Sequence, residues 1–386
     1  MTEELNWQNR VRHFLEREPV KLALLAALAV VLFVAVTGIS RLYQAQQQSL
    51  GSRWFNRGVD DLNAKQFDRA VIEFRAALVY SRDNYDYQLN LAKSLVGLKR
   101  PGEAYAYLIN LWDRQPEDGL VNLELARIAA QRGQNEQAQR YYHNAIYATW
   151  PGDAASSETE RRDARLELIE YLLKINARPQ AQAELMALTA NLGDDPEEQM
   201  KVGNLYLQAQ DYEHALAAFR DALKGEHHDA AALAGAGRAA FELARYDMAE
   251  KYLRDAVAAN AADTESADRL RTTELVLRLD PFRAEISAAQ RNRAVLDAFA
   301  TAGERLKSCA AASGSATPTE SESSLADNWT KMRPQVTAAG LARNPDLVSA
   351  AMGLVFDVEQ HASATCGTPA GADLALLLIA KLHEGN

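Results

Sequence analysis

Large apolar residues recur every three or four positions through much of the chain, the spacing that places side chains on one face of an α-helix. In residues 212–223 this stripe consists of Tyr212, Leu216, Phe219 and Leu223. Residues 67–78 show the same order of apolar, small and polar positions when the two stretches are aligned without a gap. The pattern therefore predicts amphipathic helices that derive from one recurring unit.

A small residue inside this pattern gives the period of the recurrence. It occurs at Ala70, Ala104, Ala138, Ala181, Ala215 and Ala249. The interval between successive members is constant, except for a longer one between the third and the fourth. Extra residues around 150–158 account for the longer interval, and we expect them to form a loop between two units.

The constant interval of about 34 residues, with these residue types, resembles the tetratricopeptide repeat, a unit of two antiparallel helices. The resemblance covers six units, at residues 51–84, 85–118, 119–152, 162–195, 196–229 and 230–263. It implies an all-α, right-handed superhelical solenoid, whose stacked hairpins bury the apolar flanks that one hairpin leaves open. A further small residue lies in the first helix of five units, at Gly58, Ala92, Ala126, Gly203 and Gly237. We expect it to face the recurring alanine of the second helix, so that the paired backbones approach closely.

An uncharged apolar segment precedes the repeats, from Leu22 to Ile39. As a helix it would span about 27 Å, close to the hydrocarbon thickness of a bilayer. We predict a membrane anchor over 20–42 and a polar neck over 43–50. A cleaved signal peptide and a buried soluble helix are the alternatives, although signal peptides have a shorter apolar core and a small-residue cleavage site. Cations are somewhat denser before the segment than after it, which favours a short cytoplasmic N-terminus at 1–19 and repeats outside the cytoplasm.

The chain after the repeats divides by composition. Residues 264–309 continue the helical pattern and would cap the last repeat, because an array must cover its open apolar end. The small and polar stretch 310–324 predicts a disordered linker, and 325–386 predicts a helical C-terminal segment. The two cysteines, Cys309 and Cys366, would form one disulfide in an oxidising compartment. Two unrelated buried thiols are the alternative.

Charge and motif content disfavour several classes of function. The net charge of −10 argues against nucleic-acid partners, whose phosphates require a clustered basic surface. A glycine pattern like that of a dinucleotide site, at 235–240, falls inside a predicted repeat helix. No nucleophile, phosphate loop, metal-ligand set or cofactor motif is evident, so we predict a protein without enzymatic activity. The alternative enzyme would draw on polar residues of the C-terminal segment, namely Asp357, Glu359, His361, Asp373 and His383.

The family resemblance implies where a partner would bind, in a concave groove lined by the first helix of each unit. The groove position in successive units is held by Val59, Lys93, Arg127, Glu170, Asn204 and Arg238, and neighbouring columns add Phe55, Leu89, Leu123, Leu166, Met200 and Phe241. Packing at unit interfaces is the alternative role for each of these residues. Lys93 and Arg127 lie one repeat apart in one column. We expect their joint replacement by Glu to weaken partner binding while the melting temperature stays nearly unchanged.

Together these features predict a single-pass protein of a bacterial inner membrane, with a periplasmic repeat scaffold that binds a protein or peptide. A role in the assembly or export of cell-envelope components fits this arrangement. The alternative is a cytoplasm-facing adaptor similar to lipopolysaccharide assembly protein B, which also combines an N-terminal anchor with such repeats. That family ends in a four-cysteine metal module, whereas this chain has two cysteines in all.

Overall fold

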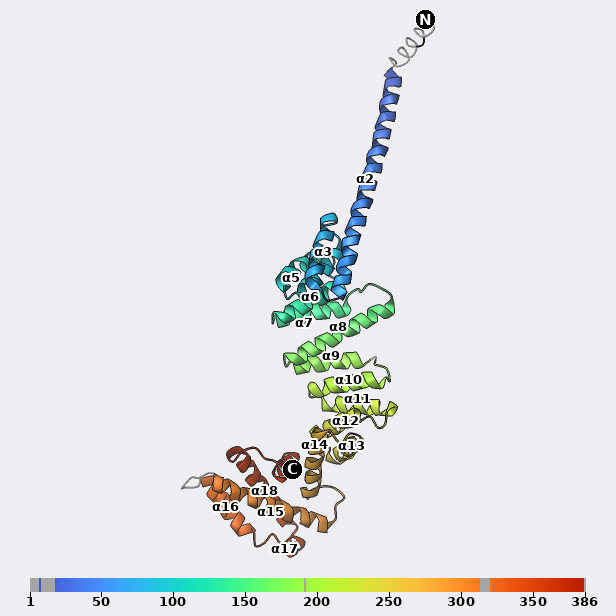
Figure 1. Cartoon of the computed structure of the whole chain (residues 1–386). Helices are drawn as coiled ribbons and strands as arrows, with labels where there is room; N and C mark the ends of the chain where they lie inside the picture. Colours follow the sequence, from blue (N-terminus) through green and yellow to red (C-terminus); the bar gives the residue numbers. More distant parts are fainter. Residues whose placement is uncertain (1–6, 8–17, 191, 313–319, 385–386) are drawn as a thin grey trace. The chain divides into compact units, whose positions relative to one another are not determined.

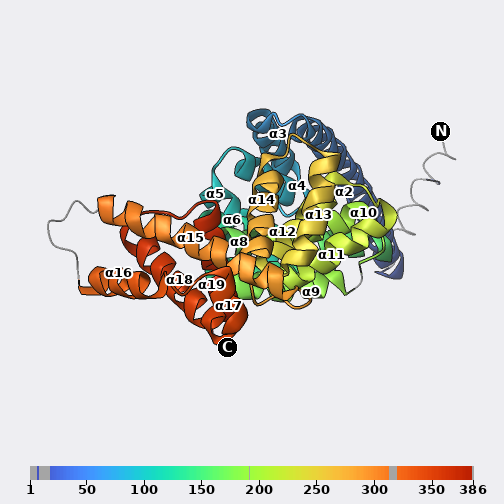
Figure 2. The same cartoon turned by 90° about the horizontal axis from the view of Figure 1, so that it is seen from below.

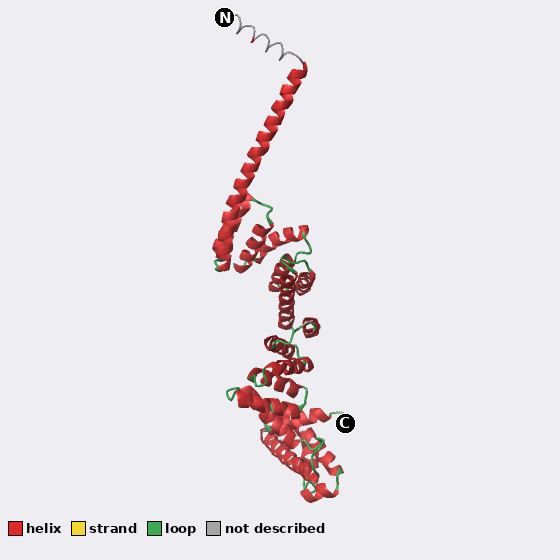
Figure 3. Ribbon diagram, turned by 90° about the vertical axis from the view of Figure 1, so that its right-hand side faces the viewer, coloured by secondary structure: helices red, strands yellow, loops and turns green. Residues whose placement is uncertain are grey.

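Every regular element in the described part of the protein is an α-helix in the computed structural model (Figures 1 and 3). The structure describes Trp7 and residues 18–190, 192–312 and 320–384. Within these ranges no β-strand occurs, and one isolated bridge joins Asp118 to Thr149. The prediction of an all-α fold is therefore confirmed. The chain divides into two compact units, Met1–Leu168 and Ile169–Asn386.

The first unit is built from antiparallel helical hairpins. Its described helices are α2 (Glu18–Asn63), α3 (Phe67–Tyr80), α4 (Tyr85–Gly97), α5 (Pro101–Arg114), α6 (Gly119–Gln131), α7 (Asn135–Tyr147) and the larger part of α8 (Ala154–Lys174). The end of α2 packs on α3, α4 packs on α5, and α6 packs on α7. The apolar stripe in the sequence becomes the buried face of each second helix, as Ala70, Phe74 and Ala77 show in α3.

α2 is a single helix of 46 residues that joins the apolar segment to the first hairpin without a break (Figure 1). The polar neck expected over 43–50 is therefore part of this helix. Each large apolar side chain between Leu22 and Leu42 is more than half exposed. Among the described residues, α2 is the one helix long and apolar enough to cross a membrane. The expected cytoplasmic N-terminus, 1–19, lies almost wholly outside the described residues.

The turn within each hairpin places one residue in the left-handed region of the backbone map. These residues are Lys65, Lys99, Gly133, Asn176, Gln210 and Ala244, with φ between 56° and 68°. They share one column of the repeat, because their spacing equals the period everywhere except across the insertion. Most first helices begin at an N-cap, after the loop that joins one hairpin to the next. In four of them an Asp or Asn side chain accepts a hydrogen bond from a first-turn amide, at Asn84, Asp118, Asp195 and Asp229.

The insertion forms mostly helix, and the expectation of a loop over 150–158 is wrong for its second half. α8 begins at Ala154, so the extra residues lengthen this first helix at its N-terminal end. The short loop before it is fixed by Trp150, which is 4% exposed. The indole lies over Gly119, and its Nε1 donates to the carbonyl oxygen of Ala145 at 2.8 Å. A run of Ala, Ser and Glu at 154–158 favours helix once the loop is held at Trp150.

The first-helix glycines lie directly against a large side chain of the second helix; their approach to the recurring alanine remains a prediction. A Cβ atom on Gly58 would lie 2.7 Å from the ring of Phe74, and one on Gly203 would lie 2.9 Å from that of Phe219. Each aromatic residue follows the recurring alanine by four positions, on the same helix face. Glycine is needed because the ring lies directly against the backbone of the first helix.

The second unit contains the remaining hairpins and the C-terminal helices. Its described helices after α8 are α9 (Arg178–Thr189), α10 (Pro196–Gln208), α11 (Tyr212–Gly225), α12 (Ala230–Glu242), α13 (Tyr246–Ala259), α14 (Thr264–Leu279), α15 (Ala288–Ala312), α16 (Glu320–Met332), α17 (Ala338–Arg343), α18 (Asp346–Thr365) and α19 (Ala372–His383). α14 begins one repeat period after α12 and packs on both α12 and α13. It therefore takes the place of a first helix in a seventh hairpin.

α19 and α15 cover α14 in place of a seventh second helix. α15 packs along α18, and α19 lies against α14 and α18 (Figure 2). One apolar cluster joins these helices, including Val276, Val295, Val355, Leu376 and Ile379. The C-terminal segment thus completes the core that ends the array.

Two boundaries in this region differ from the sequence expectation. The linker expected over 310–324 is shorter, since 310–312 belong to α15 and 320–324 to α16; residues 313–319 lie outside the described residues. α19 begins at Ala372, after Gly371 with φ 56°. The Thr-Pro pair at 368–369 resembles a helix start but is followed here by a glycine turn.

Candidate partner-binding face

The predicted groove residues of the first unit differ in how far they are buried. Leu89 and Leu123 are only 3% and 6% exposed, so they serve packing between helices. Phe55 likewise stacks on Tyr87, with 5.0 Å between ring centroids. Lys93 on α4 is half-buried and forms no ion pair with the residues that the structure describes. Of these positions, Lys93 remains available to a ligand.

Arg127 on α6 is held by two carboxylates. Its Nε donates to Glu167 at 2.9 Å, its Nη1 donates to Glu124 at 2.7 Å, and a further short contact joins Nη2 to Glu167. The hydrogen bonds to Glu167, together with the charge of Glu124, raise the pKa of Arg127 above its ordinary value. Glu124 is 5% exposed, so the ion pair neutralises a buried charge. The arginine therefore ties α6 to α8, so we predict that its replacement lowers stability, in contrast to the expectation from the sequence.

In the second unit, three polar residues of one column follow successive first helices. Asn204 on α10 and Arg238 on α12 are exposed, and Thr272 on α14 is half-buried. α12 packs against both α10 and α14. Arg238 forms no ion pair within the described residues. We call Asn204, Arg238 and Thr272 the polar row.

The remaining residues of the predicted groove lie outside the polar row, and some of them pack within the protein. Met200 is half-buried, and its carbonyl oxygen accepts a hydrogen bond from the side chain of Asn204 at 3.0 Å. Phe241 packs edge-on against Tyr246, with 5.7 Å between ring centroids, and is part of the core around α14. Glu170 on α8 is exposed and Leu166, in the first unit, is half-buried. Val59 in the first unit is half-buried as well.

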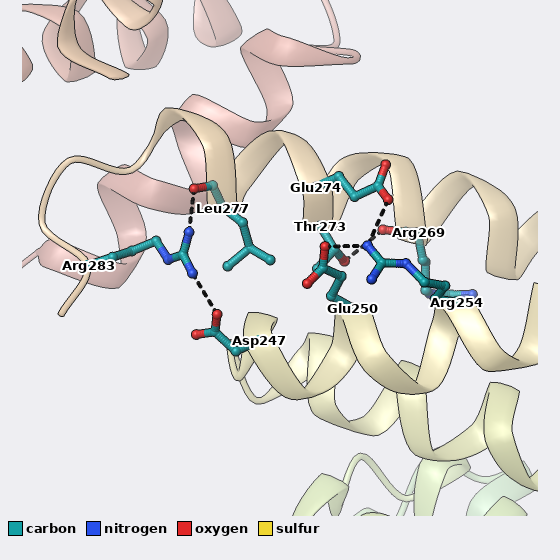
Figure 4. A network of polar contacts seen from close by, with 8 residues as sticks. All are labelled: Asp247, Glu250, Arg254, Arg269, Thr273, Glu274, Leu277 and Arg283. Carbon is teal, nitrogen blue, oxygen red and sulfur yellow. Dashed lines mark hydrogen bonds and ion pairs between the residues drawn. The ribbon is translucent and has the colours of Figure 1, made fainter. Parts of the chain in front are cut away.

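Thr272 was missed because the resemblance covers six units and ends at residue 263. The signal was nonetheless present, since Thr272 follows Arg238 by one full repeat period. One ion pair fastens α14, which carries this threonine, to α13: Arg254 on α13 reaches Glu274 at 3.5 Å (Figure 4). Arg254 also pairs with Glu250 on its own helix at 2.7 Å.

The loop after α14 is fastened in the same way. Arg283 donates to the carbonyl oxygen of Leu277 at 2.7 Å and pairs with Asp247 at 2.7 Å (Figure 4). The first of these contacts satisfies a carbonyl at the end of the helix. These contacts fix α14 against the preceding hairpin.

The polar residues of the C-terminal segment have different partners. His383 contacts both carboxylate oxygens of Asp280, a 3%-exposed residue that follows α14, at 3.2 Å each. Asp357 is exposed on α18, whereas Glu359 on the same helix is buried. No group of three or more potential metal ligands is found among the described residues.

Glu359 is an unusual buried carboxylate. It is 0% exposed, and neither of its oxygens has a hydrogen-bond partner among the described residues. Burial, with a smaller contribution from Asp373, raises the pKa of Glu359 to about 8, while Arg305 opposes the shift. Arg305 itself lies 3.7 Å from Asp373. Because a buried charge without partners is costly, the glutamate is protonated at neutral pH.

Cys309 at the end of α15 and Cys366 after α18 lie side by side. Their Cα atoms are 5.4 Å apart and their sulfur atoms are in contact. This separation lies within the range of protein disulfides. Formation of the bond in the protein remains a prediction.

Comparison with known proteins identifies the repeat. Residues 230–263, which form α12 and α13, match the family model of the tetratricopeptide repeat. The interpretation of the chain as a tetratricopeptide-repeat protein is therefore confirmed. No curated protein matches the chain.

Several solved structures are similar over part of this chain. PilF of Pseudomonas aeruginosa is 15% identical, with 57% of this chain and 97% of that chain covered and a TM-score of 0.40. PilW, a type IV pilus biogenesis factor, is 16% identical, with 58% and 98% covered and a TM-score of 0.39. The C-terminal part of a repeat protein from Cytophaga hutchinsonii is 13% identical, with 64% and 94% covered and a TM-score of 0.45. Because these TM-scores are below 0.5, the functions of those proteins carry no weight for this chain.

Proposed function

We propose that this protein is a membrane-anchored tetratricopeptide-repeat scaffold that binds a protein or peptide outside the cytoplasm. α2 supplies the anchor, and the repeats supply the binding surface. Such arrays present successive first helices side by side, which suits the recognition of an extended segment. Assembly or export of cell-envelope components is the setting that we propose for this activity.

The exposed apolar part of α2 is the observation that carries the proposal. Each large apolar side chain from Leu22 to Leu42 is more than half exposed, although water disfavours such a surface. A bilayer would cover all sides of the helix at once. Since α2 continues into the first hairpin, the anchor would hold the repeats directly at the membrane surface.

The polar row supports a partner that offers carbonyl or carboxylate oxygens. Arg238 supplies a cationic fork, and Asn204, which uses one amide N–H on the carbonyl oxygen of Met200, has a second one to offer. The hydroxyl of Thr272 donates to the carbonyl oxygen of Asp268 at 3.1 Å and can accept a hydrogen bond. Because these three polar groups are spaced by successive first helices, they suit an extended segment better than one small ligand. We therefore propose an extended peptide that carries at least one acidic group.

Photo-cross-linking in the producing cell tests this assignment. A photo-reactive amino acid would replace Asn204 or Thr272, and a control would carry it at Lys251 on the exposed side of α13. We expect a discrete adduct from the two row positions, and its loss when Arg238→Glu is added. Adducts of equal yield from the Lys251 control, or adducts unchanged by Arg238→Glu, would remove the polar row from the proposal.

A cytoplasm-facing adaptor is the second candidate. Its anchor and repeats would be the same, but the membrane orientation would be reversed. The proximity of Cys309 and Cys366 favours the first candidate, because structural disulfides persist in oxidising compartments.

A further inference from the structure

The two cysteines differ in how far another molecule can reach them. Cys309 lies within α15 and is 4% exposed, whereas Cys366 is the C-cap of α18 and is half-buried. Their Cα atoms are 5.4 Å apart, so a bond between them would join the end of α15 to the end of α18. Thiol–disulfide exchange requires that one sulfur atom contacts another. Of the pair, Cys366 is the sulfur that a partner can contact.

The chain that follows Cys366 leaves room for a partner. Residues 367–370 belong to no helix, and three of the four are exposed. Gly367 has a φ of 97°, and apart from its chain neighbours no described atom lies within 4 Å of the position that a Cβ atom would take there. The backbone around Cys309 is instead part of a helix that continues to Ala312. The segment after Cys366 can therefore lie along a partner protein and offer it backbone hydrogen bonds.

Contacts that do not involve sulfur hold Cys366 beside Cys309. Arg305, one turn before Cys309 on α15, donates from Nη2 to the carbonyl oxygen of Gly367 at 2.9 Å. The same guanidinium lies 3.7 Å from Asp373 in the first turn of α19. Apolar side chains also pack α15 against α18. These contacts can bring the two thiols together before a bond joins them.

We propose that Cys366 is the site at which a thiol–disulfide oxidoreductase introduces the bond. The Cys366 thiolate attacks the disulfide of the oxidoreductase, which gives a mixed disulfide and releases one oxidoreductase thiolate. The Cys309 thiolate then attacks the sulfur of Cys366 and displaces the second oxidoreductase thiolate. The chain loses two electrons and two protons, and the oxidoreductase gains both as its dithiol. In the cell, this step rests on the proposed location outside the cytoplasm.

Burial determines the order of the two steps. If Cys309 reacted first, α15 would have to open locally to admit the oxidoreductase. With Cys366 first, Cys309 takes part only in the second step. That step occurs within the chain and needs no access for a partner. Arg305 acts in the second step as a positioning residue, because it holds the turn at Gly367 against α15.

Two single-cysteine variants of the full chain, reduced and purified in detergent micelles, test the order. Cys309→Ser retains Cys366, and Cys366→Ser retains Cys309. Glutathione disulfide is the probe, and mass spectrometry follows the glutathione adduct. We expect Cys366 to react at least about tenfold faster than Cys309 in the folded protein, because a buried thiol reacts only through local opening. In urea, which removes the difference in burial, the two rates should agree.

The chain with both cysteines provides a test that does not depend on the folding of these variants. Arg305→Gln should leave the rate of glutathione addition unchanged but prolong the mixed disulfide, and peptide mapping should find the glutathione on Cys366. Lys307→Gln, at an exposed cation of the same helix, is the control and should leave both steps unchanged. An oxidoreductase that lacks its resolving cysteine should accumulate as an adduct of Cys309→Ser and not of Cys366→Ser.

Distinct results would overturn each part of the proposal. Equal rates in the folded protein, or glutathione mapped to Cys309, would overturn the assignment of Cys366. Exchange with glutathione but no adduct with the oxidoreductase would overturn the class of partner. A mixed disulfide of unchanged lifetime in Arg305→Gln would remove the positioning role of Arg305. Since the purified chain has no membrane orientation, these results are independent of the proposed location, which a reporter fused to the chain tests separately.

Discussion

Individual residues show which parts of the repeat are fixed by the backbone and which by side chains. The hairpin turn requires a left-handed conformation in all six units, yet the sequence supplies glycine there once, at Gly133. The other five turns are held in this conformation by hydrogen bonds from the next amides to carbonyls of the preceding helix, such as Arg100 to Leu95 at 2.9 Å. These turns were not evident from the sequence, because Lys, Asn, Gln and Ala are weaker turn signals than glycine.

Introducing glycine at one of these turns and removing it at another should change stability in opposite directions. Lys99→Gly should stabilise the protein by up to about 1 kcal/mol. The left-handed conformation costs an L-residue about 1–2 kcal/mol, and glycine avoids this cost but loses more conformational entropy on folding. Gly133→Ala should destabilise it by about 1 kcal/mol, since open space around Gly133 leaves only the backbone cost. Chemical denaturation of both variants measures the difference, and equal shifts would contradict the turn assignment.

The glycine–aromatic contact provides a second test at this scale. The ring of Phe219 is enclosed by Gly203 and Gly235, where added Cβ atoms would lie 2.9 Å and 2.4 Å away. Gly203→Ala should therefore destabilise the protein by about 1–3 kcal/mol, because the ring has no room to move.

The second repeat, residues 85–118, suggests a matched rescue for this change. There the same two columns hold Ala92 and Leu108, both 0% exposed. Gly203→Ala combined with Phe219→Leu should recover part of the stability lost in the single variants. Strictly additive losses in a double-mutant cycle would contradict direct contact between the two positions.

At the scale of elements, period and hydrophobic pattern predict the paired helices well but predict their ends poorly. The column spacing locates α3, α11 and their partners, since burial of one helix face repeats with the unit. The continuity of α2 and the lengthening of α8 could not be predicted, because polar residues at 43–50 and 154–161 are compatible with either helix or loop. Such solvent-exposed segments lack the apolar periodicity that identifies a helix.

The buried glutamate of α18 should give the C-terminal core an unusual pH dependence. The pKa of Glu359 is about 8 in the folded protein, above its ordinary value of 4.5. The folded state then binds more protons than the unfolded state between these pH values, so the free energy of unfolding falls as the pH rises from about 4.5 to 8. Arg305 and Asp373 are the charged groups that act on it.

Glu359→Gln should remove this decline, since the amide cannot ionise. Asp357→Asn, at an exposed carboxyl on the same helix, is the control and should retain it. Melting temperatures measured from pH 5 to pH 9 provide the test. Parallel pH profiles for Glu359→Gln and the unmodified chain would show that Glu359 ionises normally.

For the molecule as a whole, the binding face was predictable only in part. The repeat columns led to Lys93, Asn204 and Arg238, because exposure along a first helix follows the period. They could not reveal that Arg127 is occupied, since its partner Glu167 comes from the helix that the insertion lengthens. A residue that binds within the chain and one that binds a partner have the same sequence signature.

Separate charge reversals should distinguish these two roles. Arg127→Glu should lower the melting temperature, because it leaves three carboxylates together and removes the partner of the buried Glu124. Lys93→Glu should change the free energy of unfolding by no more than about 0.5 kcal/mol. Equal melting temperatures for the two variants would indicate that the Arg127 ion pair contributes nothing.

The central claim is that α2 crosses a membrane and holds the repeats outside the cytoplasm. The most direct measurement is the activity of two reporters fused separately after Asn386, one active only in the cytoplasm and one active only outside it. Both fusions would be compared for equal amounts of protein in the membrane fraction. We expect activity from the extracytoplasmic reporter alone. Activity from the cytoplasmic reporter alone would contradict the orientation, and recovery of the chain in the soluble fraction would contradict the anchor.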